Sequence, residues 1–391
     1  MENYISAKKS KIRIGPIYVA IILSIIPLFN YNIAGRGLFL YLGIGLFLVF
    51  IVSSHKFTIN RLYRNYIFYI IYDFMTFLWA QDWSDLLQYL RLIVFIFLII
   101  FLEYNDREIE LIWLGQILLG VVIVLILITT SNTMVAQGQY LTDTQRAILV
   151  IGGVQIDPNY AAMLLFPLGI FICKLLLEDN IQFRFKMVGM VGFMLIIYAL
   201  LRAGTRGGLL AIIIGGVYYF FKKKTSLGKK IVIIILIIGF SVIIIPRLFL
   251  LLPDAITRRF TLNYLLQNGG AGRSEYWKIC LGHISDTPWT MLFGHGKQAT
   301  ISLLGIASHN YFVDTLYNGG IIGFCLLIIF YISLLNKLEK MRNIYAQALL
   351  IAYISMSMTV SVGANMYFWT GIVVIMLIAS MSKFSLRERK R

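Results

Sequence analysis

Acidic side chains are scarce in this chain, whose 391 residues include 18 aspartates and glutamates against 35 lysines and arginines. Charged residues of both signs make up only 14% of the sequence, whereas 59% of it is hydrophobic. A soluble domain cannot bury that much apolar surface, because a folded globule still exposes a large share of its area. The composition therefore excludes an ordinary soluble enzyme and indicates an integral membrane protein.

Cysteines and clustered metal ligands are also few. The three cysteines are far apart, at Cys173, Cys280 and Cys325, so the sequence supports neither a disulfide framework nor a thiolate metal site. It contains no nucleotide-binding loop and no pair of closely spaced acidic residues beside a histidine in an outer segment. The scattered outer aspartates, which leave only a weak metal site open, are Asp143, Asp157, Asp254 and Asp286. We therefore expect no metal and no other cofactor, which argues against a metal-dependent sugar-nucleotide transferase.

Long hydrophobic runs are present, and they set the fold class. Stretches of about 18–20 apolar residues indicate membrane-spanning helices. Twelve such spans are expected, at 14–31, 37–53, 66–80, 89–103, 110–130, 158–177, 187–202, 208–221, 231–246, 309–334, 345–361 and 367–381. The third is short and contains Asp73. The N-terminus "MENYISAKKSKIR" is too short and too basic to add a cleaved signal peptide, so the first span is expected to be retained. The sequence predicts an all-α integral membrane protein with one polytopic domain over residues 1–391.

The basic residues fall mostly on one side of these spans. With the N-terminus inside, most lysines and arginines lie in cytoplasmic segments, including "KKKTSLGKK" (222–230) and the tail "KFSLRERKR". This asymmetry predicts that both termini are cytoplasmic, and it explains most of the net charge of +17 without a nucleic-acid partner. The polar segment 247–308 falls outside. Because an irregular loop cannot lie in hydrocarbon, this segment is expected to cap the bundle or line a cavity in it.

Several charged and aromatic residues lie on the outer side, where the charge bias disfavours cations. The outer basic residues are Arg36, Arg146, Arg202, Arg206, Arg247, Arg258, Arg259, Arg273, Lys278 and Lys297. His283, His295 and His309 are on the same side, as are most of the tryptophans. The interfacial aromatic belt is the favoured explanation for the tryptophans. Sugar stacking is the alternative, and Trp277 and Trp289 are its best candidates.

The stretch "LLRAGTRGGLL" (200–210) places two arginines in an apolar region. If the helix continues through residue 206, Arg202 and Arg206 share one face, and their guanidinium groups match phosphate oxygens in geometry. Gly204, Gly207 and Gly208 either break the helix or allow something to approach its backbone closely. The alternatives to an anion site are a carboxylate partner in the bundle and snorkelling to the surface.

A second candidate site lies in "ASHNYFVDTLYNGGIIG" (307–323). His309 at the mouth of an outer cavity can act as a general base near neutral pH. Asn310 and Asp314 are spaced to share a helical face. A helix-capping or purely structural histidine is the alternative, and for an isolated histidine it is the more common case.

Three further groups are candidates for substrate binding. Arg273 in "GRSEYW" (272–277) follows a glycine turn and reaches either a ligand or the neighbouring Glu275. In "DPNYAA" (157–162) a helix start explains Asp157 and Pro158 but leaves Asn159 and Tyr160 free. Arg91 lies about one helical turn below the outer surface. Its partner is Asp85, Asp73 or a ligand.

The order of four motifs resembles the O-antigen ligase and polymerase superfamily. These motifs are "TRGGLLA" (205–211), "GRSEYW", "FGHG" (293–296) and "SHNYFVDTLYNGGIIG", and the likeness covers about residues 130–335. The resemblance implies a helical bundle of the membrane glycosyltransferase (GT-C-like) type whose long outer loop, 247–308, closes the active site. It also implies that Arg206 and Arg273 bind the pyrophosphate of an undecaprenyl-pyrophosphate-linked glycan, and that His309 activates the acceptor hydroxyl. The chain has "TRGG" where "SRG" is commoner, which is a conservative difference.

The "DPNYAA" stretch looks like the polymerase branch of that superfamily. The resemblance therefore implies a metal-independent, inverting polymerase that joins lipid-linked repeat units of O-antigen or capsule on the outer face of the bacterial cytoplasmic membrane. Its partners would be the lipid-linked donor and acceptor, membrane lipid and, as a further candidate, a chain-length regulator. The expected substrate-binding residues are Arg202, Arg91, Asn310, Asp314, Asp157, Asn159, Tyr160 and Trp277. The alternatives are an O-antigen ligase that transfers the glycan to lipid A–core and, in another class, a transporter or flippase of lipid-linked oligosaccharides.

Overall fold

The computed structural model describes residues 13–29, 31–33, 36–53, 63–130, 146–151, 153–267 and 272–381. The described chain is mostly helical, with two short antiparallel hairpins. The basic residues Lys8, Lys9 and Lys11, the C-terminal tail and Asp143 lie outside the described residues.

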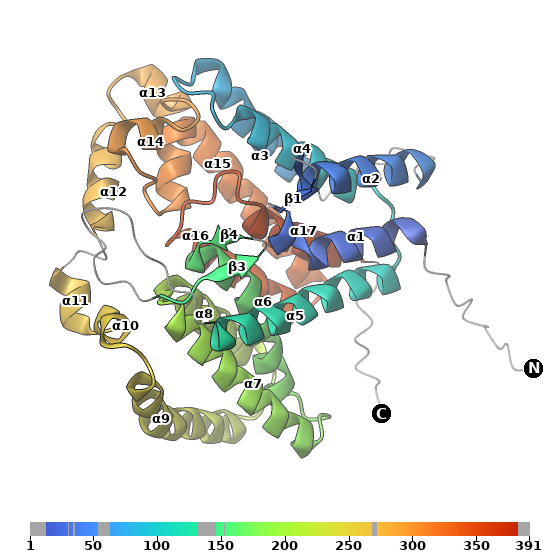
Figure 1. Cartoon of the computed structure of the whole chain (residues 1–391), viewed down its shortest axis with the longest axis vertical. Helices are drawn as coiled ribbons and strands as arrows, with labels where there is room; N and C mark the ends of the chain where they lie inside the picture. The colour runs from blue at the N-terminus through green and yellow to red at the C-terminus, as the bar shows by residue number, and fades with distance from the viewer. Residues whose placement is uncertain are drawn as a thin grey trace, which may run out of the picture.

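The described residues of the first half of the chain form seven α-helices and both hairpins (Figure 1). Its helices are α1 (Ile14–Ser24), α2 (Leu38–Ser53), α3 (Arg64–Met75), α4 (Leu86–Ile100), α5 (Asp106–Thr129), α6 (Pro158–Leu177) and α7 (Phe183–Arg202). Short 3-10 turns, η1 (Ile26–Leu28) and η3 (Thr76–Trp79), extend α1 and α3. The strands are β1 (Asn32–Ile33) with β2 (Arg36–Gly37), and β3 (Leu149–Ile151) with β4 (Val154–Ile156).

In the second half, one series of short helices lies between two groups of long helices. The long helices are α8 (Arg206–Lys222), α9 (Leu227–Leu250), α15 (Tyr311–Lys340), α16 (Ile344–Ser357) and α17 (Met366–Ser380). Between α9 and α15 lie α10 (Asp254–Arg259), α11 (Leu262–Gln267), α12 (Arg273–Gly282), α13 (Pro288–Phe293) and α14 (Ala299–Leu304). These five short helices follow one another along the left side of Figure 1.

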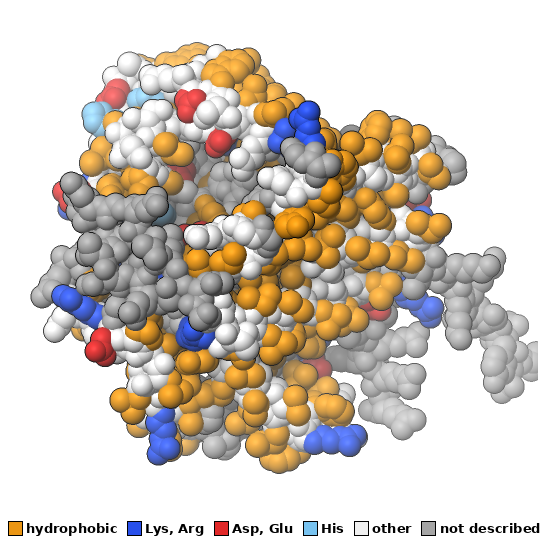
Figure 2. Space-filling view, in the orientation of Figure 1, with side chains coloured by type: hydrophobic (Ala, Val, Ile, Leu, Met, Phe, Trp, Pro, Cys, Tyr) orange, Lys and Arg blue, Asp and Glu red, His pale blue; other side chains and the backbone are white. Residues whose placement is uncertain are grey.

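Every stretch expected to span the membrane contains a helix, and 158–177 coincides with α6. By length and composition, four of the described helices can cross a membrane, namely α5, α6, α7 and α15. Shorter apolar helices accompany them, including α1, α2, α4, α16 and α17. Figure 2 shows hydrophobic side chains over most of the described surface on one face. These features are those of a membrane protein.

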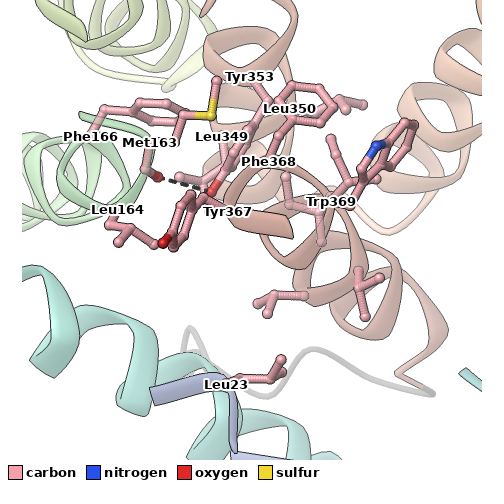
Figure 3. Close-up of a cluster of buried hydrophobic side chains, with 14 of the residues drawn as sticks. Leu23, Met163, Leu164, Phe166, Leu349, Leu350, Tyr353, Tyr367, Phe368 and Trp369 are labelled. Carbon is pink, nitrogen blue, oxygen red and sulfur yellow. Dashed lines mark hydrogen bonds between the residues drawn. The ribbon is translucent and has the colours of Figure 1, made fainter. Parts of the chain in front are cut away.

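The core forms where α6, α8, α16 and α17 pack together. Its centre is built from large side chains such as Phe166, Tyr353, Phe368 and Trp369, all nearly or fully buried (Figure 3). The Tyr353 hydroxyl donates a hydrogen bond of 3.2 Å to the carbonyl of Met163, which joins α16 to α6 inside this apolar region. A buried tyrosine needs such a partner because an unpaired hydroxyl in an apolar core is costly. This packing holds the N-terminal ends of α6 and α8 against the end of α16.

The segment expected as the outer loop, 247–308, is largely helical, and α9 continues to Leu250 instead of ending near residue 246. Helices α12, α13 and α14 pack against α15. Gly320 has φ of 64° and kinks α15. The "FGHG" motif fits this kink, since the backbone N–H groups of His295 and Gly296 donate to the carbonyls of Tyr317 and Asn318 at 2.9 and 3.0 Å. The kink therefore anchors the short helices to α15.

Candidate functional site

A tight turn separates Arg202 from Arg206. Helix α7 ends at Arg202, Gly204 takes φ of +60°, and Thr205 caps α8 by accepting a hydrogen bond from the backbone N–H of Gly208. Arg206 is then the first residue of α8. The expectation that Arg202 and Arg206 share a helical face is wrong, because the glycine in the left-handed region ends one helix and lets the next begin.

Arg202 caps another helix. Its guanidinium donates to the carbonyls of Leu127, Ile128 and Thr130 at 3.1, 2.6 and 2.8 Å. Leu127 and Ile128 belong to the last turn of α5, whose carbonyls lack partners within the helix and carry the negative end of its dipole, and Thr130 directly follows the helix. Arg202 therefore stabilises the C-terminal end of α5, and the described contacts do not place it beside Arg206.

Arg206 and Arg273 approach the same short segment after α16. The ideal Cβ of Gly207 would lie 2.3 Å from Oγ1 of Thr359, so only glycine allows the start of α8 to pack this closely there. Arg273 is the first residue of α12, and its Nη1 donates to the carbonyl of Thr359 at 2.7 Å. The structure thus brings together two residues that are 67 positions apart in the printed sequence.

Two arginines that the sequence motifs did not single out join them. The Nε of Arg146 donates to the carbonyl of Ala203 at 2.9 Å. An ideal Cβ on Gly204 would lie 3.2 Å from Nε of Arg146 and 3.5 Å from Nε of Arg259, so both guanidinium groups flank this glycine. We call Arg146, Arg206, Arg259 and Arg273 the arginine cluster. Both additional residues are among the outer basic residues, but no local motif marks them.

The cluster concentrates positive charge in a partly buried place. Burial, and then the neighbouring guanidinium groups, lower the pKa of Arg146 and that of Arg273 to about 10. Burial also lowers the pKa of Arg259. The carboxylate of Asp157 opposes this effect at all three. With such pKa values these arginines still carry their charge at neutral pH.

The cluster has unused hydrogen-bond donors. Among the residues that the structure describes, Nη1 of Arg206 and Nε of Arg259 are buried without a hydrogen-bond partner. Within the described part of the chain, no carboxylate forms an ion pair with any of the four arginines. A buried donor without a partner is costly, and the N-terminus of α8 adds further positive potential. The arrangement is therefore suited to binding an anion with several oxygens, such as a diphosphate.

His309 lies beside the cluster. Its backbone has φ of 58°, an uncommon conformation for a residue with a side chain, and its N–H donates to Oγ of Ser361 at 2.9 Å. Burial, and then the charge of Arg273, lower the pKa of His309 below its usual 6.5, while Asp157 opposes the shift. The imidazole is therefore mainly neutral at pH 7, which is the form that accepts a proton.

The "DPNYAA" stretch begins α6 beside the same residues. The side chain of Asp157 accepts a hydrogen bond of 2.7 Å from the backbone N–H of Asn159 and so caps the helix, as the sequence suggests. The hydroxyl of Tyr160 lies 3.4 Å from the carbonyl of Ser361, the residue that also contacts His309. In the described part of the chain the side chain of Asn159 has no hydrogen-bond partner, and it is half-buried.

Three other candidates make internal contacts. Asn310 caps α15 by accepting from the backbone N–H groups of Phe312 and Val313. Asp314 accepts a hydrogen bond of 2.6 Å from the hydroxyl of Ser308. Trp277 donates from its indole to the carbonyl of Ser308 at 2.9 Å and packs beside a small buried cluster. Each of these contacts helps to fix the loop that carries His309.

Arg91 is exposed on α4. One of the partners suggested for it, Asp73, forms an ion pair with a different cation. Asp73 binds Lys297, with 2.5 Å between Oδ2 and Nζ, and it also accepts a hydrogen bond from Tyr89. Asp73 is therefore not the partner of Arg91, because the "FGHG" loop brings Lys297 to α3 instead.

A cavity of about 240 Å³ is linked to His309 through Ser361, which lies on its wall and accepts a hydrogen bond from the backbone N–H of His309. Tyr160, Asp314 and Ser361 lie on its wall, together with the Asp73–Lys297 pair. Its remaining wall comes largely from α4, α14, α15 and the segment between α16 and α17. No described group of three or more histidine, cysteine, aspartate or glutamate side chains is arranged to hold a metal ion.

Sequence comparisons bear on the same part of the chain. Residues 191–328 match the family model described as O-antigen ligase, and this range includes Arg206, Arg259, Arg273 and His309. None of the curated proteins compared with the chain matches it. The match over residues 191–328 confirms the resemblance of the chain to the O-antigen ligase and polymerase superfamily and supports glycosyl transfer of the ligase or polymerase type as its general function.

Proposed function

We propose that this protein is a polysaccharide polymerase. It joins oligosaccharide repeat units carried on a lipid pyrophosphate, of the undecaprenyl type, at the outer face of the bacterial cytoplasmic membrane. The observation that carries the proposal is the arginine cluster, whose buried donors lack carboxylate partners among the described residues and lie beside His309. The match to the O-antigen ligase family supports the reaction class.

The arginine cluster would bind the diphosphate of the donor. When the glycosidic bond to phosphate breaks, negative charge builds up on the leaving oxygen. Guanidinium groups fixed in a water-poor site stabilise that charge more strongly in the transition state than in the ground state. Arg206 and Arg273 hold the central positions, while Arg146 and Arg259 add charge around Gly204.

His309 would accept the proton of the attacking hydroxyl on the acceptor repeat unit. Its lowered pKa keeps it neutral at pH 7, and its backbone is held by Ser361. Direct displacement of the diphosphate inverts the anomeric centre. The energy comes from the pyrophosphate-linked donor, so the reaction needs neither a nucleotide nor a metal ion.

The proposed arrangement in the membrane follows from the charge bias of the sequence. Twelve helices of a GT-C-like bundle would span the bilayer, with both termini in the cytoplasm and the site outside. The segment 247–308 would cover the site, and Arg259 and Arg273 come from its short helices α10 and α12. A loop of this kind can exclude water while the substrates react.

A ligase is the second candidate, because the matching family model is described as O-antigen ligase. A ligase would use the same donor and the same arginine cluster, but its acceptor would be lipid A–core. The two functions therefore differ in the acceptor and not in the diphosphate site.

Reconstitution separates these functions. The purified full chain in proteoliposomes is given a lipid-linked repeat unit alone, and the products are sized. A polymerase yields a ladder of longer glycans. A ligase forms a product only when lipid A–core is added, and that product is the supplied glycan attached to lipid A–core. Arg206→Ala and His309→Ala should abolish the ladder while the protein stays inserted and abundant. If both variants make normal ladders, the proposed site is wrong.

A further inference from the structure

The cavity beside His309 has a polar lining that the catalytic proposal does not use. Gln298 and Thr315 lie on its wall and are 9% and 5% exposed. Nε2 of Gln298 and Oγ1 of Thr315 are buried, and no described residue forms a hydrogen bond with either atom. Buried polar groups are nearly always paired, so two unpaired groups on one cavity wall suggest that a ligand with hydroxyl or amide groups pairs with them.

The backbone of Gln298 adds a second observation. This residue has φ of 64°, in the left-handed region, and precedes α14 without capping it through its side chain. Such a conformation costs free energy in a residue with a Cβ atom and persists where the surroundings fix it, often at functional sites. The side chain is thereby kept at the cavity wall although it makes no capping contact.

The charges around the cavity differ in sign from those of the arginine cluster. Asp73, Asp85 and Asp314 lie on its wall, and Lys297 is the basic residue there. Lys297 is already paired with Asp73 and lies 4.1 Å from the ring centre of Tyr89. The cavity therefore carries an excess of carboxylates, next to a cluster that carries an excess of guanidinium groups.

Ser361 connects the two regions. Ser361 lines the cavity and accepts a hydrogen bond from the backbone N–H of His309. The charges of Arg273 and Asp157 in turn shift the pKa of the His309 imidazole. Tyr160 lines the cavity and bonds to Ser361. Ser361 therefore links the cavity to the backbone of the proposed base, while the charge of Arg273 acts on that base from the arginine cluster.

We propose that this cavity binds the terminal sugar of the acceptor, and that it selects a neutral or amino sugar over a uronic acid. Its assignment to the acceptor rests on the proposed function, since the arginine cluster takes the donor. The cavity volume of about 240 Å³ lies below the roughly 300–1,000 Å³ of pockets that bury drug-sized ligands, so it suits one sugar ring. Carboxylates and amides bind sugar hydroxyls, whereas a uronate would face carboxylates without a free cation.

Binding of three monosaccharide probes to the full chain in nanodiscs tests this site. The probes are the methyl glycosides of N-acetylglucosamine, glucosamine and glucuronic acid, measured at pH 7 by saturation-transfer NMR. We expect the first two to bind at least about tenfold more tightly than the glucuronide. Thr315→Val and Gln298→Leu should each weaken binding of the neutral probe about three- to tenfold, the effect of one lost hydrogen bond. Thr370→Val, at a buried threonine of α17 away from the cavity lining, is the matched control and should change nothing.

Equal binding of the glucuronide, or unchanged binding of the neutral probe in Thr315→Val, would overturn the inference. None of the probes carries a phosphate, so the result does not depend on the arginine cluster. If the probes fail while Arg206→Ala still abolishes polymer in proteoliposomes, only the acceptor site is wrong. If the wild-type protein makes no polymer at all, the proposed function itself is wrong.

Discussion

Replacing Arg206 by lysine keeps the positive charge and removes the planar pair of donors. Arg206 begins α8, and its Nη1 is buried without a hydrogen-bond partner among the described residues. We therefore expect this atom to bond to a phosphate oxygen of the donor. Lysine has a single ammonium group, which cannot make the parallel two-pronged contact that a guanidinium makes.

The size of the effect follows from one charge-assisted hydrogen bond. Such bonds contribute about 1.5–3 kcal/mol. Since about 1.36 kcal/mol corresponds to tenfold in rate, Arg206→Lys should lower kcat/KM by roughly 10- to 150-fold. Arg206→Ala removes the charge as well, and its loss should reach about 100- to 1,000-fold or more.

Arg202→Lys is the matched control, four positions away. Arg202 bonds to three carbonyls at the end of α5, so its change should act on stability. A contact of this kind with a helix terminus contributes up to about 2 kcal/mol. We expect the free energy of unfolding to fall by about 1 kcal/mol, with kcat/KM per folded molecule within about threefold of wild type.

The assay is initial-rate polymer formation in proteoliposomes, normalised to folded protein and accompanied by a thermal-stability measurement. The reasoning is refuted if Arg206→Lys retains the wild-type rate, or if Arg202→Lys loses as much activity as Arg206→Lys. The second result would mean that both arginines serve the site despite the turn at Gly204.

Further predictions concern pH, the turn, a buried ion pair and metal ions. Activity should fall as His309 is protonated, so kcat/KM should have an acid limb centred below pH 6.5, and a midpoint above that value contradicts a lowered pKa. Gly204→Ala should destabilise the protein by about 1–2 kcal/mol, because φ is +60° and the new Cβ would lie 3.2 Å from Nε of Arg146; an unchanged melting temperature would argue against this turn. Lys297→Met should cost about 3–5 kcal/mol by leaving Asp73 buried alone, and Asp73→Leu in the same chain should recover part of it in thermal unfolding. EDTA should leave the initial rate of polymer formation unchanged, and a loss that Mg²⁺ restores would contradict a metal-independent reaction.

The helices were largely predictable from hydrophobic runs, because apolar length is a local property of the sequence. The range 158–177 matched α6, and the other expected spans each contain a helix. The end of α9 was missed because Leu248, Phe249 and Leu250 continue the helix past Pro246 and Arg247. The expected end at residue 246 therefore came four residues before the end of α9 at Leu250.

The site was predictable only where a motif marked it. Arg206, Arg273 and His309 followed from the resemblance, and the structure places them near one another. Arg146 and Arg259 were not predicted, because what brings them together is the turn at Gly204, a contact between segments distant in sequence. No local pattern carries that information.

The same limit explains the residues that were misplaced. The sequence shows that Arg202 is four residues from Arg206, but not that Gly204 reverses the chain and turns Arg202 toward the end of α5. It likewise shows that Asp73 is a charge in an apolar span, but not that Lys297 returns to neutralise it. Both cases depend on which segments meet in three dimensions.

Binding of the donor's carrier lipid tests the central claim most directly. Native mass spectrometry of the full chain in nanodiscs can compare undecaprenyl pyrophosphate, undecaprenyl phosphate and undecaprenol, for the wild type and for Arg206→Gln with Arg273→Gln. The account predicts that the wild type binds the pyrophosphate most tightly and that the double variant loses this preference while still binding the uncharged lipid. Equal binding of the three lipids by the wild type, or an unchanged preference in the double variant, would contradict it.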